Sequence, residues 1–326
     1  MTVLVTGATG TVGSALAARL VADGRPVRAL VRDVGRARTL LPEQIELVAG
    51  DVLDSASIEA AVEGCDTVFH VAGLPEQWRQ DMGDFDRVNA GGTDTVARAA
   101  LAAGVSSFVF TSTIDVFAWP SEPGATFDET ALATAPKHTH YERSKQKADG
   151  IVTALIDEGL PARFVAPAGV FGPVPVITPG ANHLIRRLLL NQIPISLPGG
   201  LPVVYGPDVA DLHVLAETAP VGSRFIASDR YVTLEAFARA VTAIEPSAKV
   251  PRTLPVLAAR AIAHAGEAVS KLTRKAPLLT TGELSFLIGD VRPDASKAQR
   301  EVGWTVTPFE EALATTIEHL RPLLRD

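Results

Sequence analysis

Tyr141 and Lys145 are four residues apart in a segment with helical periodicity, and their side-chain types are those of an acid–base pair. At this spacing both side chains lie on one helix face, with their Cβ atoms ~6 Å apart. A free phenol has a pKa of about 10, so it exchanges protons poorly near neutral pH. An ammonium group ~5–6 Å away contributes about 3 kcal/mol at an effective dielectric constant of ~20, which lowers the phenol pKa by roughly two units. The pair therefore indicates general acid–base catalysis.

A glycine-rich turn lies near the start of the chain, in the segment Thr6-Gly7-Ala8-Thr9-Gly10-Thr11-Val12-Gly13. Gly7 allows a tight turn, Gly10 lets the backbone approach a pyrophosphate, and Gly13 permits a helix to pack closely on a strand. The spacing GxxGxxG differs from GxGxxG, but the segment follows an apolar strand pattern and opens a helical one, so it predicts a dinucleotide site. We expect the phosphates to contact Gly7, Thr9, Gly10, Thr11, Val12 and Gly13.

The residues after the second predicted strand bear on the choice between NADP and NAD. In NAD sites an acid at this point binds the adenosine ribose, whereas here Arg32 precedes Asp33. A guanidinium suits the 2′-phosphate of NADP through forked, charge-assisted hydrogen bonds. NADP is therefore the predicted cofactor, and NAD is the alternative because a shift of one residue would exchange Arg32 and Asp33. Asp51 and Val52, after the third strand, are expected beside the adenine, with an ordinary turn acid as the alternative for Asp51.

Hydroxyl and amide groups follow on two further segments. Phe108–Thr113 is an apolar strand that ends in hydroxyls, at the edge where open α/β sheets bind ligands. Asn89 lies on the preceding helical segment. With the glycine turn and YxxxK, these segments occur in the order of the short-chain dehydrogenase/reductase family, and the chain resembles its extended branch. The resemblance covers essentially the whole length, including 69–73, Gly172-Pro173, 208–210, 294–297 and 302–304.

This resemblance implies a role for each matching residue. Tyr141 is the expected general acid–base, and Lys145 its activator and a ligand of the nicotinamide ribose. Thr113 occupies the position of the hydroxyl that holds the substrate oxygen, and Asn89 would help to order a proton-relay water. Further cofactor contacts are implied for Val71, Ala72, Gly73, Thr111, Pro167, Gly169 and Val170. Ala166 departs from the pattern, because many extended members have an arginine there.

The residues after Thr113 bear on the type of reaction. Sugar dehydratases of the extended branch carry an Asp-Glu pair directly after the catalytic threonine, whereas this chain has Ile114-Asp115. An isoleucine cannot protonate a leaving hydroxyl, so dehydration is disfavoured. Asp115 is an unusual carboxylate near the pocket, and it is either a structural cap at the strand end or a substrate contact.

The segments expected around the substrate are mostly apolar, and we expect about half of their side chains to be core. Such a lining suits a bulky apolar carbonyl or alcohol. We predict substrate contacts at Trp78, Ile114, Asp115, Phe117 and Phe171. The profile most resembles dihydroflavonol-reductase-like and 3β-hydroxysteroid-dehydrogenase-like members, and hopanoid-associated epimerases look similar too. The resemblance implies NADP-dependent hydride transfer between the nicotinamide and a carbonyl or secondary alcohol of a bulky, mostly apolar small-molecule substrate.

Two other functions stay open at this point. A nucleotide-sugar epimerase with tightly held NAD(P) needs donors for a diphosphate, which Arg186, Arg187, Arg224 and Arg292 could supply. An NADP-binding sensor without turnover is the other alternative. Relatives of that kind commonly lack the tyrosine or the lysine, and both are present here.

The elements that must position these groups follow from the hydrophobic pattern. Short apolar segments at 3–6, 27–31, 45–48, 67–71, 108–112 and 163–166 predict strands, and helical patterns at 12–22, 55–62, 85–103 and 141–158 lie between them. Fully apolar strands that alternate with helices are typical of a doubly wound parallel sheet, a Rossmann-type α/β fold.

After residue 170 the pattern changes to a smaller, mostly helical substrate region. Pro and Gly are dense from 167 to 207, so 164–185 reads as a strand and an irregular loop, and helices are expected at 208–217, 234–244, 257–272 and 309–320. The predicted dinucleotide-binding domain is 1–170, with 203–228 returning to it and a strand at 225–227. The predicted substrate region is 171–202 and 229–326. The helix at 257–272 is expected to pack on the body.

Composition excludes several classes of protein. Among 326 residues, 47% are hydrophobic and 21% charged, which excludes a disordered chain. The net charge of −7 without a basic run disfavours nucleic acid. Cys65 stands alone, and His138 and His140 have no recognisable third ligand, so no metal is predicted. His70 ends an apolar strand and reads as a core histidine.

Location and assembly are also predicted from the sequence. No basic leader is present, and prolines and glycines interrupt the one uncharged stretch of membrane-spanning length, so we expect a cytoplasmic protein with no integral membrane segment. The helices at 85–103 and 141–158 could pair in a homodimer, and a monomer is equally compatible.

Overall fold

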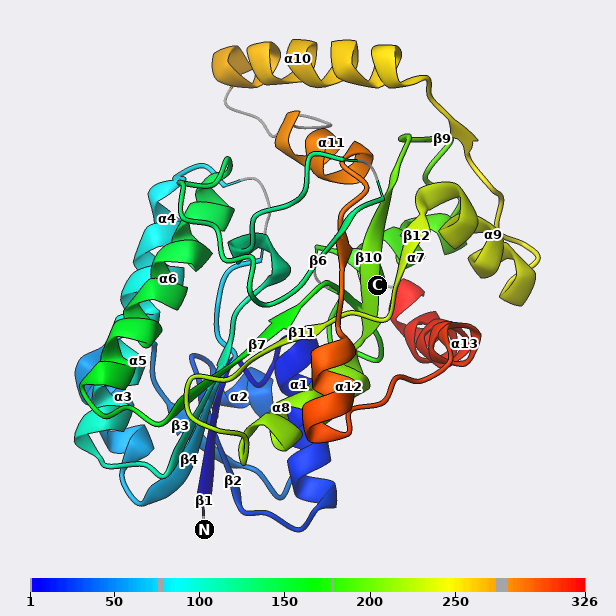
Figure 1. Ribbon diagram of the computed structural model, residues 1–326. Coiled ribbons are helices and arrows are strands. Elements are labelled where there is room, and N and C mark those ends of the chain that lie inside the picture. Colours follow the sequence, from blue (N-terminus) through cyan, green and yellow to red (C-terminus); the bar gives the residue numbers. More distant parts are fainter. Residues whose placement is uncertain (1, 76–78, 123, 178, 274–280, 326) are drawn as a thin grey trace.

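A computed structural model of the protein describes residues 2–75, 79–122, 124–177, 179–273 and 281–325. Within these residues, the central layer is a seven-stranded sheet of order β11-β7-β5-β4-β1-β2-β3, and every pairing in it is parallel (Figure 1). The predicted Rossmann-type fold is confirmed. The strands are β1 Thr2–Thr6, β2 Val27–Val31, β3 Glu46–Ala49, β4 Cys65–His70, β5 Ser107–Thr111, β7 Ala162–Pro167 and β11 Arg224–Ala227. The order reverses between β1 and β4, and ligands of such sheets bind beside the carboxyl ends of strands at that point.

Helices cover both faces of this sheet. On one face α1 (Thr11–Ala22) lies beside α8 (Gly206–Ala216), and α12 (Ser296–Val302) contacts β11. On the other face α3 (Ser55–Val62), α5 (Gly92–Ala102) and α6 (His140–Asp157) pack side by side. A short helix, α2 (Val34–Leu40), connects β2 to β3.

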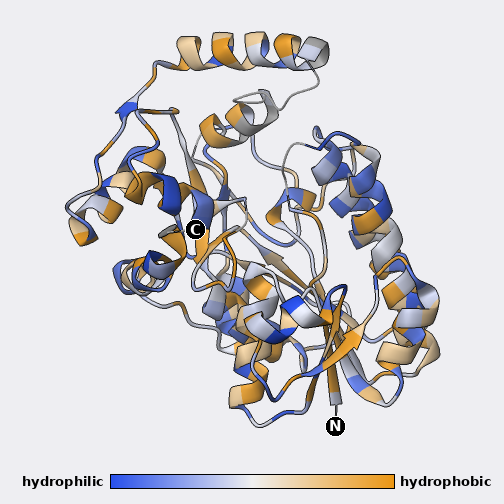
Figure 2. Cartoon of the chain, turned by 180° about the vertical axis from the view of Figure 1, so that it is seen from behind, coloured by the Kyte–Doolittle hydropathy of each residue, from blue (hydrophilic) through white to orange (hydrophobic). Residues whose placement is uncertain are grey.

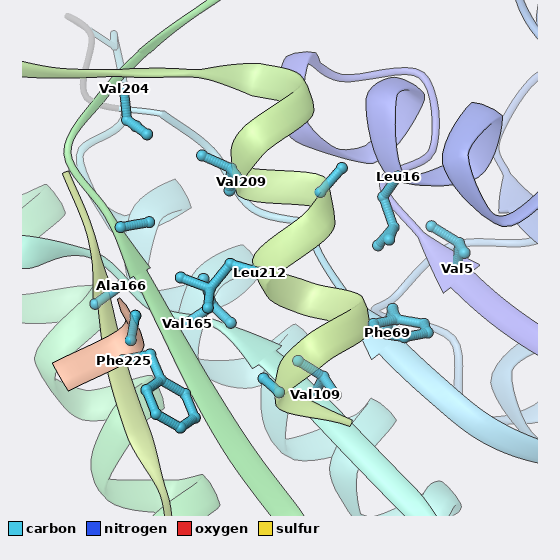
Figure 3. Packing of buried hydrophobic residues seen from close by; sticks show 14 of the residues in the cluster. Val5, Leu16, Phe69, Val109, Val165, Ala166, Val204, Val209, Leu212 and Phe225 are labelled. Atoms are coloured by element: carbon cyan, nitrogen blue, oxygen red, sulfur yellow. The ribbon is translucent and has the colours of Figure 1, made fainter. Parts of the chain in front are cut away.

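Alternate strand residues divide the core into two layers, as the period of a strand requires. Val5 and Phe69 pack with Leu16 of α1 and Leu212 of α8 (Figure 3). The neighbouring Leu4 belongs to the other cluster, with α3, α5 and α6. Because both faces are covered, the strands bury apolar side chains on both sides of the sheet.

A second region follows β7. In the described part of the chain it contains a three-stranded sheet in which β8 (Gly169–Phe171) is parallel and β12 (Arg230–Thr233) antiparallel to β10 (Gly200–Tyr205). The helices α7 (Ala181–Leu189), α9 (Leu234–Ile244) and α13 (Phe309–Leu320) bury a cluster centred on Phe171, Phe237 and Phe309. Short pairs join Thr126–Phe127 (β6) to Arg292–Pro293 (β14) and Ile195–Ser196 (β9) to Arg252–Thr253 (β13), and a 3₁₀ turn covers Arg321–Arg325.

The segment 164–185 is more regular than its composition predicts. α7 begins directly after Pro179 and Gly180, so these residues end the preceding loop and do not interrupt a helix. β10 is also absent from the prediction. Pro202 and the neighbouring glycines are typical of loops, but the segment forms a strand that pairs on both sides. In the predicted return segment 203–228, α8 and β11 join the first layer, whereas β10 lies in the second sheet. The domain boundaries themselves stay a prediction.

The helix α10 (Val256–Thr273) exposes most of its described residues. It packs on α11 (Thr281–Ile288) through Ala259 and Ala263, and it lies at the top of the view in Figure 1. Contact with the body is therefore restricted to one narrow face, and Leu257 is 79% exposed. Hydrophobic and hydrophilic residues mix along α10 (Figure 2). Among the described residues no helix combines the length and the apolar character that crossing a bilayer requires.

Candidate active site

The glycine turn after β1 has the close packing that a dinucleotide cradle requires. Gly7 has a φ of +72°, and a Cβ there would lie 2.7 Å from the Cα of Ala72, in the loop after β4. A Cβ on Gly13 would overlap Gly7 O, so α1 packs directly on the turn. Gly10 precedes α1 and supplies no side-chain cap. The N-terminus of α1 therefore suits an anionic group such as a phosphate.

The predicted adenosine contacts lie at the ends of β2 and β3. Arg32 is exposed, and no hydrogen bond or ion pair of its guanidinium occurs among the described residues. The carboxylate of Asp33 instead caps α2, where Oδ1 accepts from Arg36 N at 2.9 Å. Asp51 forms a turn through Oδ1 and Leu53 N at 3.0 Å, which agrees with the alternative of an ordinary turn acid. Val52 contacts the start of α5, where a Cβ on Gly92 would lie 2.7 Å from its Cγ2.

A capping box starts α6 and thereby sets the place of Tyr141 and Lys145, the predicted catalytic pair. Thr139 Oγ1 accepts from Glu142 N at 3.0 Å, and Glu142 Oε2 accepts from Thr139 N at 2.7 Å. Tyr141 lies between these two residues, and its ring packs edge-on against Phe85 with the centroids 6.0 Å apart. The predicted helix start at Tyr141 is thus correct to within one residue.

Lys145 is buried, with 7% of its surface exposed. Its Nζ donates to Thr111 O at 2.8 Å and lies 4.7 Å from the centroid of the Phe110 ring. Burial lowers the pKa of the Lys145 ammonium to about 8, although the carboxylates of Asp149 and Asp115 raise it. Lys145 lies one helical turn after Tyr141, and its bond to Thr111 O connects this turn of α6 to the carboxyl end of β5.

Asn89 lies in a π-helical turn, Asp86–Gly91, between α4 (Gly83–Phe85) and α5. The single helix predicted for 85–103 is therefore interrupted, as is common for π turns at functional sites. The Asn89 side chain accepts from Leu74 N at 2.7 Å and donates to Ser144 Oγ at 2.9 Å. Ser144 Oγ in turn donates to Tyr141 O at 2.7 Å. Asn89 thus connects the loop after β4 to the backbone of the catalytic turn.

The two adjacent hydroxyls after β5 point to different partners. Ser112 Oγ donates to Asp149 Oδ2 at 2.7 Å, within a buried cluster that includes Arg224. Thr113 Oγ1 donates to Asp115 Oδ2 at 2.9 Å and accepts from Asp115 N at 3.3 Å. The structure therefore brings Thr113, Tyr141 and Lys145 to the same sheet edge, whereas the Ser112 hydroxyl is engaged elsewhere.

The chain is similar to known proteins over most of its length. A family model described as "NAD dependent epimerase/dehydratase family" matches residues 3–225. The chain belongs to this family. A putative dihydroflavonol 4-reductase of Synechocystis sp. is 28% identical over 96% of this chain and 92% of its own. A 3 beta-hydroxysteroid dehydrogenase/Delta 5-->4-isomerase of Mycobacterium tuberculosis is 35% identical over 73% of this chain and 68% of its own.

Solved structures agree with this assignment. The crystal structure of gox2253 superposes with a TM-score of 0.87 at 29% identity, over 99% of this chain and 98% of that one. The resemblance to extended short-chain dehydrogenases/reductases is confirmed, and this family member is an NAD(P)-dependent oxidoreductase. Among the described residues no three metal ligands gather, and His138 and His140 are both exposed.

The predicted substrate contacts of this epimerase/dehydratase-family chain divide into two groups. Ile114, Phe117 and Phe171 are at most 2% exposed and pack within the hydrophobic clusters, which supports the alternative that they are core residues. Asp115 keeps part of its surface accessible beside Thr113. On the cofactor side, Pro167 is buried in β7, whereas Gly169 and Val170 are half-exposed. Trp78 lies outside the described residues.

Two buried histidines hold the strand ends of this family member in place. His70 Nδ1 lies 2.8 Å from Thr6 Oγ1, and Nε2 lies 3.0 Å from Thr93 Oγ1. Because Thr93 donates its one hydroxyl hydrogen to Asn89 O, His70 must donate from Nε2 and accept at Nδ1. The chain Thr6–His70–Thr93 therefore joins the glycine turn to Asn89. His70 was predicted only as a core residue.

His213 on α8 performs the same task for β5, and sequence reasoning did not single it out. Its Nδ1 lies 2.7 Å from Val209 O, a pure acceptor, so Nδ1 carries the hydrogen. Its Nε2, 2.7 Å from Thr111 Oγ1, then accepts from that hydroxyl. Thr111 O is the acceptor for Lys145. The only sequence signal was its place four residues after Val209, one helical turn along α8.

Acid is expected to destabilise the fold through these two imidazoles. Burial lowers the pKa of His70 to about 3 and that of His213 to about 4, so the unfolded chain binds more protons below pH 6.5. The free energy of unfolding is therefore highest above pH 6.5 and decreases as the pH is lowered, by about 2 kcal/mol per histidine at pH 5. Urea unfolding at pH 7 and pH 5 measures this loss.

Two further measurements separate the histidines from other acid effects. A His213→Gln variant should lose about half of the pH-dependent difference, whatever its stability at pH 7. Ring ¹⁵N shifts should show the Nε2–H tautomer for His70 and the Nδ1–H tautomer for His213. Imidazoles that titrate between pH 6 and 7 would contradict the network.

Proposed function

We propose that this chain transfers a hydride between NADP(H) and a carbonyl or secondary alcohol of a bulky, mostly apolar substrate. The observation that carries the proposal is the convergence of Thr113, Tyr141 and Lys145 at the carboxyl edge of the sheet, with Lys145 Nζ bonded to Thr111 O. Two segments that are distant in the sequence, the end of β5 and the start of α6, supply these groups, so a chance spacing within one helix does not account for them.

The residues present fit a dinucleotide. At Gly7 and Gly13 the backbone packs so closely that a Cβ would collide with neighbouring backbone atoms. The N-terminus of α1, which has no side-chain cap, begins directly after this turn. When bound, the cofactor supplies or accepts the hydride at its nicotinamide ring. The residues proposed to hold it are Gly7, Thr9, Gly10, Thr11, Val12, Gly13, Arg32, Asp51, Val52, Val71, Ala72, Gly73, Thr111, Tyr141, Lys145, Pro167, Gly169 and Val170.

The side chains then act on the substrate oxygen. Thr113 and Tyr141 hydrogen-bond that oxygen, and Tyr141 gives its proton to it as the carbonyl carbon is reduced. The Lys145 ammonium stabilises the resulting phenolate, and the same steps in reverse serve alcohol oxidation. Asn89, which is 1% exposed, holds the Tyr141 turn through Ser144, so its proposed part is positioning and ordering of a relay water.

The choice of NADP over NAD rests on the residues after β2. The Asp33 carboxylate is engaged by the N-terminus of α2, whereas the Arg32 guanidinium is exposed at the same point. An acid committed to a helix cap is a poorer partner for ribose hydroxyls, and a guanidinium matches a phosphate.

Replacing Arg32 by Ala is expected to weaken NADPH binding by about 10- to 100-fold, because charge-assisted bonds contribute about 1.5–3 kcal/mol. The affinity for NADH should stay within about twofold, because NADH has no 2′-phosphate to contact. Fluorescence titration of both cofactors measures the two constants. The matched control is Arg239→Ala, an exposed arginine whose guanidinium pairs with Glu235 on α9. Equal losses of affinity for NADPH and NADH would indicate that Asp33, and not Arg32, determines the cofactor preference.

The proposed substrate class is dihydroflavonol- or steroid-like. The relatives named dihydroflavonol 4-reductase and 3 beta-hydroxysteroid dehydrogenase support it. Nucleotide-sugar epimerisation is less favoured, because two of the four arginines considered for a diphosphate are paired. Arg224 binds Asp149 at 2.7 Å and Arg292 binds Asp290 at 2.9 Å.

A turnover panel of apolar ketones, dihydroflavonols, steroids and nucleotide sugars tests this function by following NADPH oxidation. Net oxidation with an apolar carbonyl supports the proposal. Sugar conversion with the cofactor retained would establish the epimerase, and tight NADPH binding without any turnover would establish the sensor. Light scattering on the same samples tests the homodimer, which stays a prediction.

A further inference from the structure

We infer that Asp115 decides whether the Thr113 hydroxyl donates a hydrogen bond to the substrate oxygen or accepts one from it. The inference rests on the proposed function, because it takes Thr113 as the group that contacts the substrate oxygen. Asp115 is then a positioning residue: it acts on the substrate through Thr113.

The two side chains form a closed pair at the end of β5. Thr113 caps the 3₁₀ turn Ile114–Val116, where its Oγ1 accepts from Asp115 N at 3.3 Å and donates to Asp115 Oδ2 at 2.9 Å. Thr113 is 5% exposed, so solvent offers its hydroxyl few alternatives. The adjacent Ser112 cannot take over, because its hydroxyl is held by Asp149.

The hydrogens and lone pairs of the two side chains define two hydrogen-bonding states, one for the ionised and one for the protonated Asp115 carboxyl. A hydroxyl has one hydrogen and two acceptor sites, and Asp115 N–H already occupies one of the acceptor sites of Thr113. When the carboxylate is ionised, it takes the hydroxyl hydrogen, and the remaining acceptor site can receive only a hydrogen from a substrate alcohol. When the carboxyl is protonated, it donates to that site, and the Thr113 hydrogen is free for a carbonyl oxygen or a developing alkoxide.

The groups around Asp115 place the change of state near neutral pH. Burial raises the pKa of Asp115 to about 6, and the Glu142 carboxylate of α6 adds to this, whereas the Thr113 hydrogen bond, Lys137 and Lys145 oppose it. Lys137 approaches from the loop before α6, where its Nζ donates to Phe117 O at 2.8 Å and lies 3.9 Å from the centroid of the Trp119 ring. The carboxyl is thus flanked by cations from the loop and from α6, and by one anion.

The consequence is a pH-dependent preference between the two redox forms of the substrate. As the carboxyl ionises, carbonyl affinity and the stabilisation of the transition state should fall by about tenfold, the effect of one hydrogen bond. Alcohol affinity should rise by a similar factor. The reaction consumes a proton, so its equilibrium depends on pH, but at any one pH the state of Asp115 cannot change that equilibrium. At a given pH, Asp115 must therefore change kcat/KM by the same factor in both directions, and only the binding constants can move apart.

The Asp115→Asn variant tests this, because its amide carries N–H donors at every pH, and the amide orientation that directs one of them at Thr113 Oγ1 imitates the protonated carboxyl. In the wild type, kcat/KM for reduction should fall about tenfold between pH 5 and 7.5, whereas the variant should stay flat over this interval. At pH 7.5 the variant should therefore equal or exceed the wild type in kcat/KM and bind the alcohol about tenfold more weakly. The matched control is Asp157→Asn, an exposed aspartate at the far end of α6, which should keep the wild-type profile.

Two results would overturn the inference. One is a variant that keeps the fall near pH 6, and the other is a variant with kcat/KM lowered by the same factor at every pH, which is the signature of a purely structural cap. A ¹³C titration of the Asp115 carboxyl provides a readout that needs no substrate. Its midpoint should rise in a Thr113→Val variant, because the donor that stabilises the carboxylate is lost, and an unchanged midpoint would also refute the coupling. A wild type that turns over no carbonyl contradicts the proposed function instead, while the titration still decides whether Thr113 and Asp115 are coupled.

Discussion

Replacing Tyr141 by Phe is expected to lower kcat for carbonyl reduction by about 10²- to 10⁴-fold, the usual contribution of a general acid. Only the hydroxyl is removed, so the ring keeps its edge-on contact with Phe85, and α6 keeps its capping box. The dissociation constant of NADPH should therefore stay within about tenfold of the wild type, since a single neutral hydrogen bond contributes about 0.5–1.5 kcal/mol to net affinity. Stopped-flow NADPH oxidation and fluorescence titration measure the two quantities.

The chain offers a matched control for this substitution. Tyr231 on β12 lies beside Arg292, in the second sheet, and Tyr231→Phe removes the same atom there. That variant should retain the wild-type kcat. If Tyr141→Phe kept most of its rate, another residue would be the proton donor, and the proposed mechanism would be wrong.

Replacing Lys145 by Met is expected to produce an inactive protein that is at least as stable as the wild type. The ammonium stabilises the Tyr141 phenolate, so its loss should lower kcat by about 10²- to 10⁴-fold. Burial lowers the pKa of Lys145 from 10.5 to about 8, which means that the charged form costs about 3 kcal/mol of folding free energy. The substitution removes this cost, but it also removes the hydrogen bond to Thr111 O, which lowers the net gain in stability by about 1 kcal/mol.

The destabilisation by the buried Lys145 ammonium depends on pH. The folded pKa lies below the unfolded value, so the cost is complete below pH 8 and disappears above pH 10.5. Thermal unfolding at pH 7 should therefore give a Tm for Lys145→Met equal to or above that of the wild type. Lys147→Met is the control: its side chain is 60% exposed and pairs with Asp86 at 3.4 Å, so neither rate nor Tm should change appreciably. A strongly lowered Tm in Lys145→Met would show that the lysine is mainly structural.

Much of the candidate site could be predicted because its signals are local. The helical spacing of Tyr141 and Lys145, the glycine turn before α1 and the apolar strand before Thr113 each depend on contacts within a few residues. Parallel strands bring their carboxyl ends to one edge, so the order of the segments was sufficient to predict that these groups converge.

Other parts depended on contacts that no local pattern contains. Ile114, Phe117 and Phe171 look like pocket residues in the sequence, but their side chains face the hydrophobic clusters. The partner of Thr111 is His213, 102 residues away, and that of Thr6 is His70, 64 residues away. α7 was hidden by the prolines and glycines that precede it.

The sequence by itself determined the Rossmann-type sheet, the glycine turn before α1 and the placing of Tyr141 and Lys145 on one helix of this protein. These features arise from backbone geometry and side-chain periodicity over one or two turns of chain, and so they can be recognised without neighbours. Only the tertiary structure decided that Ser112 binds Asp149 whereas Thr113 binds Asp115, and how the buried histidines orient their hydrogens. It also decided that Asp115 lies among charges from α6 and the loop before it. The physical reason is that burial and hydrogen-bond direction are properties of the packed surroundings, which the fold assembles from distant parts of the chain.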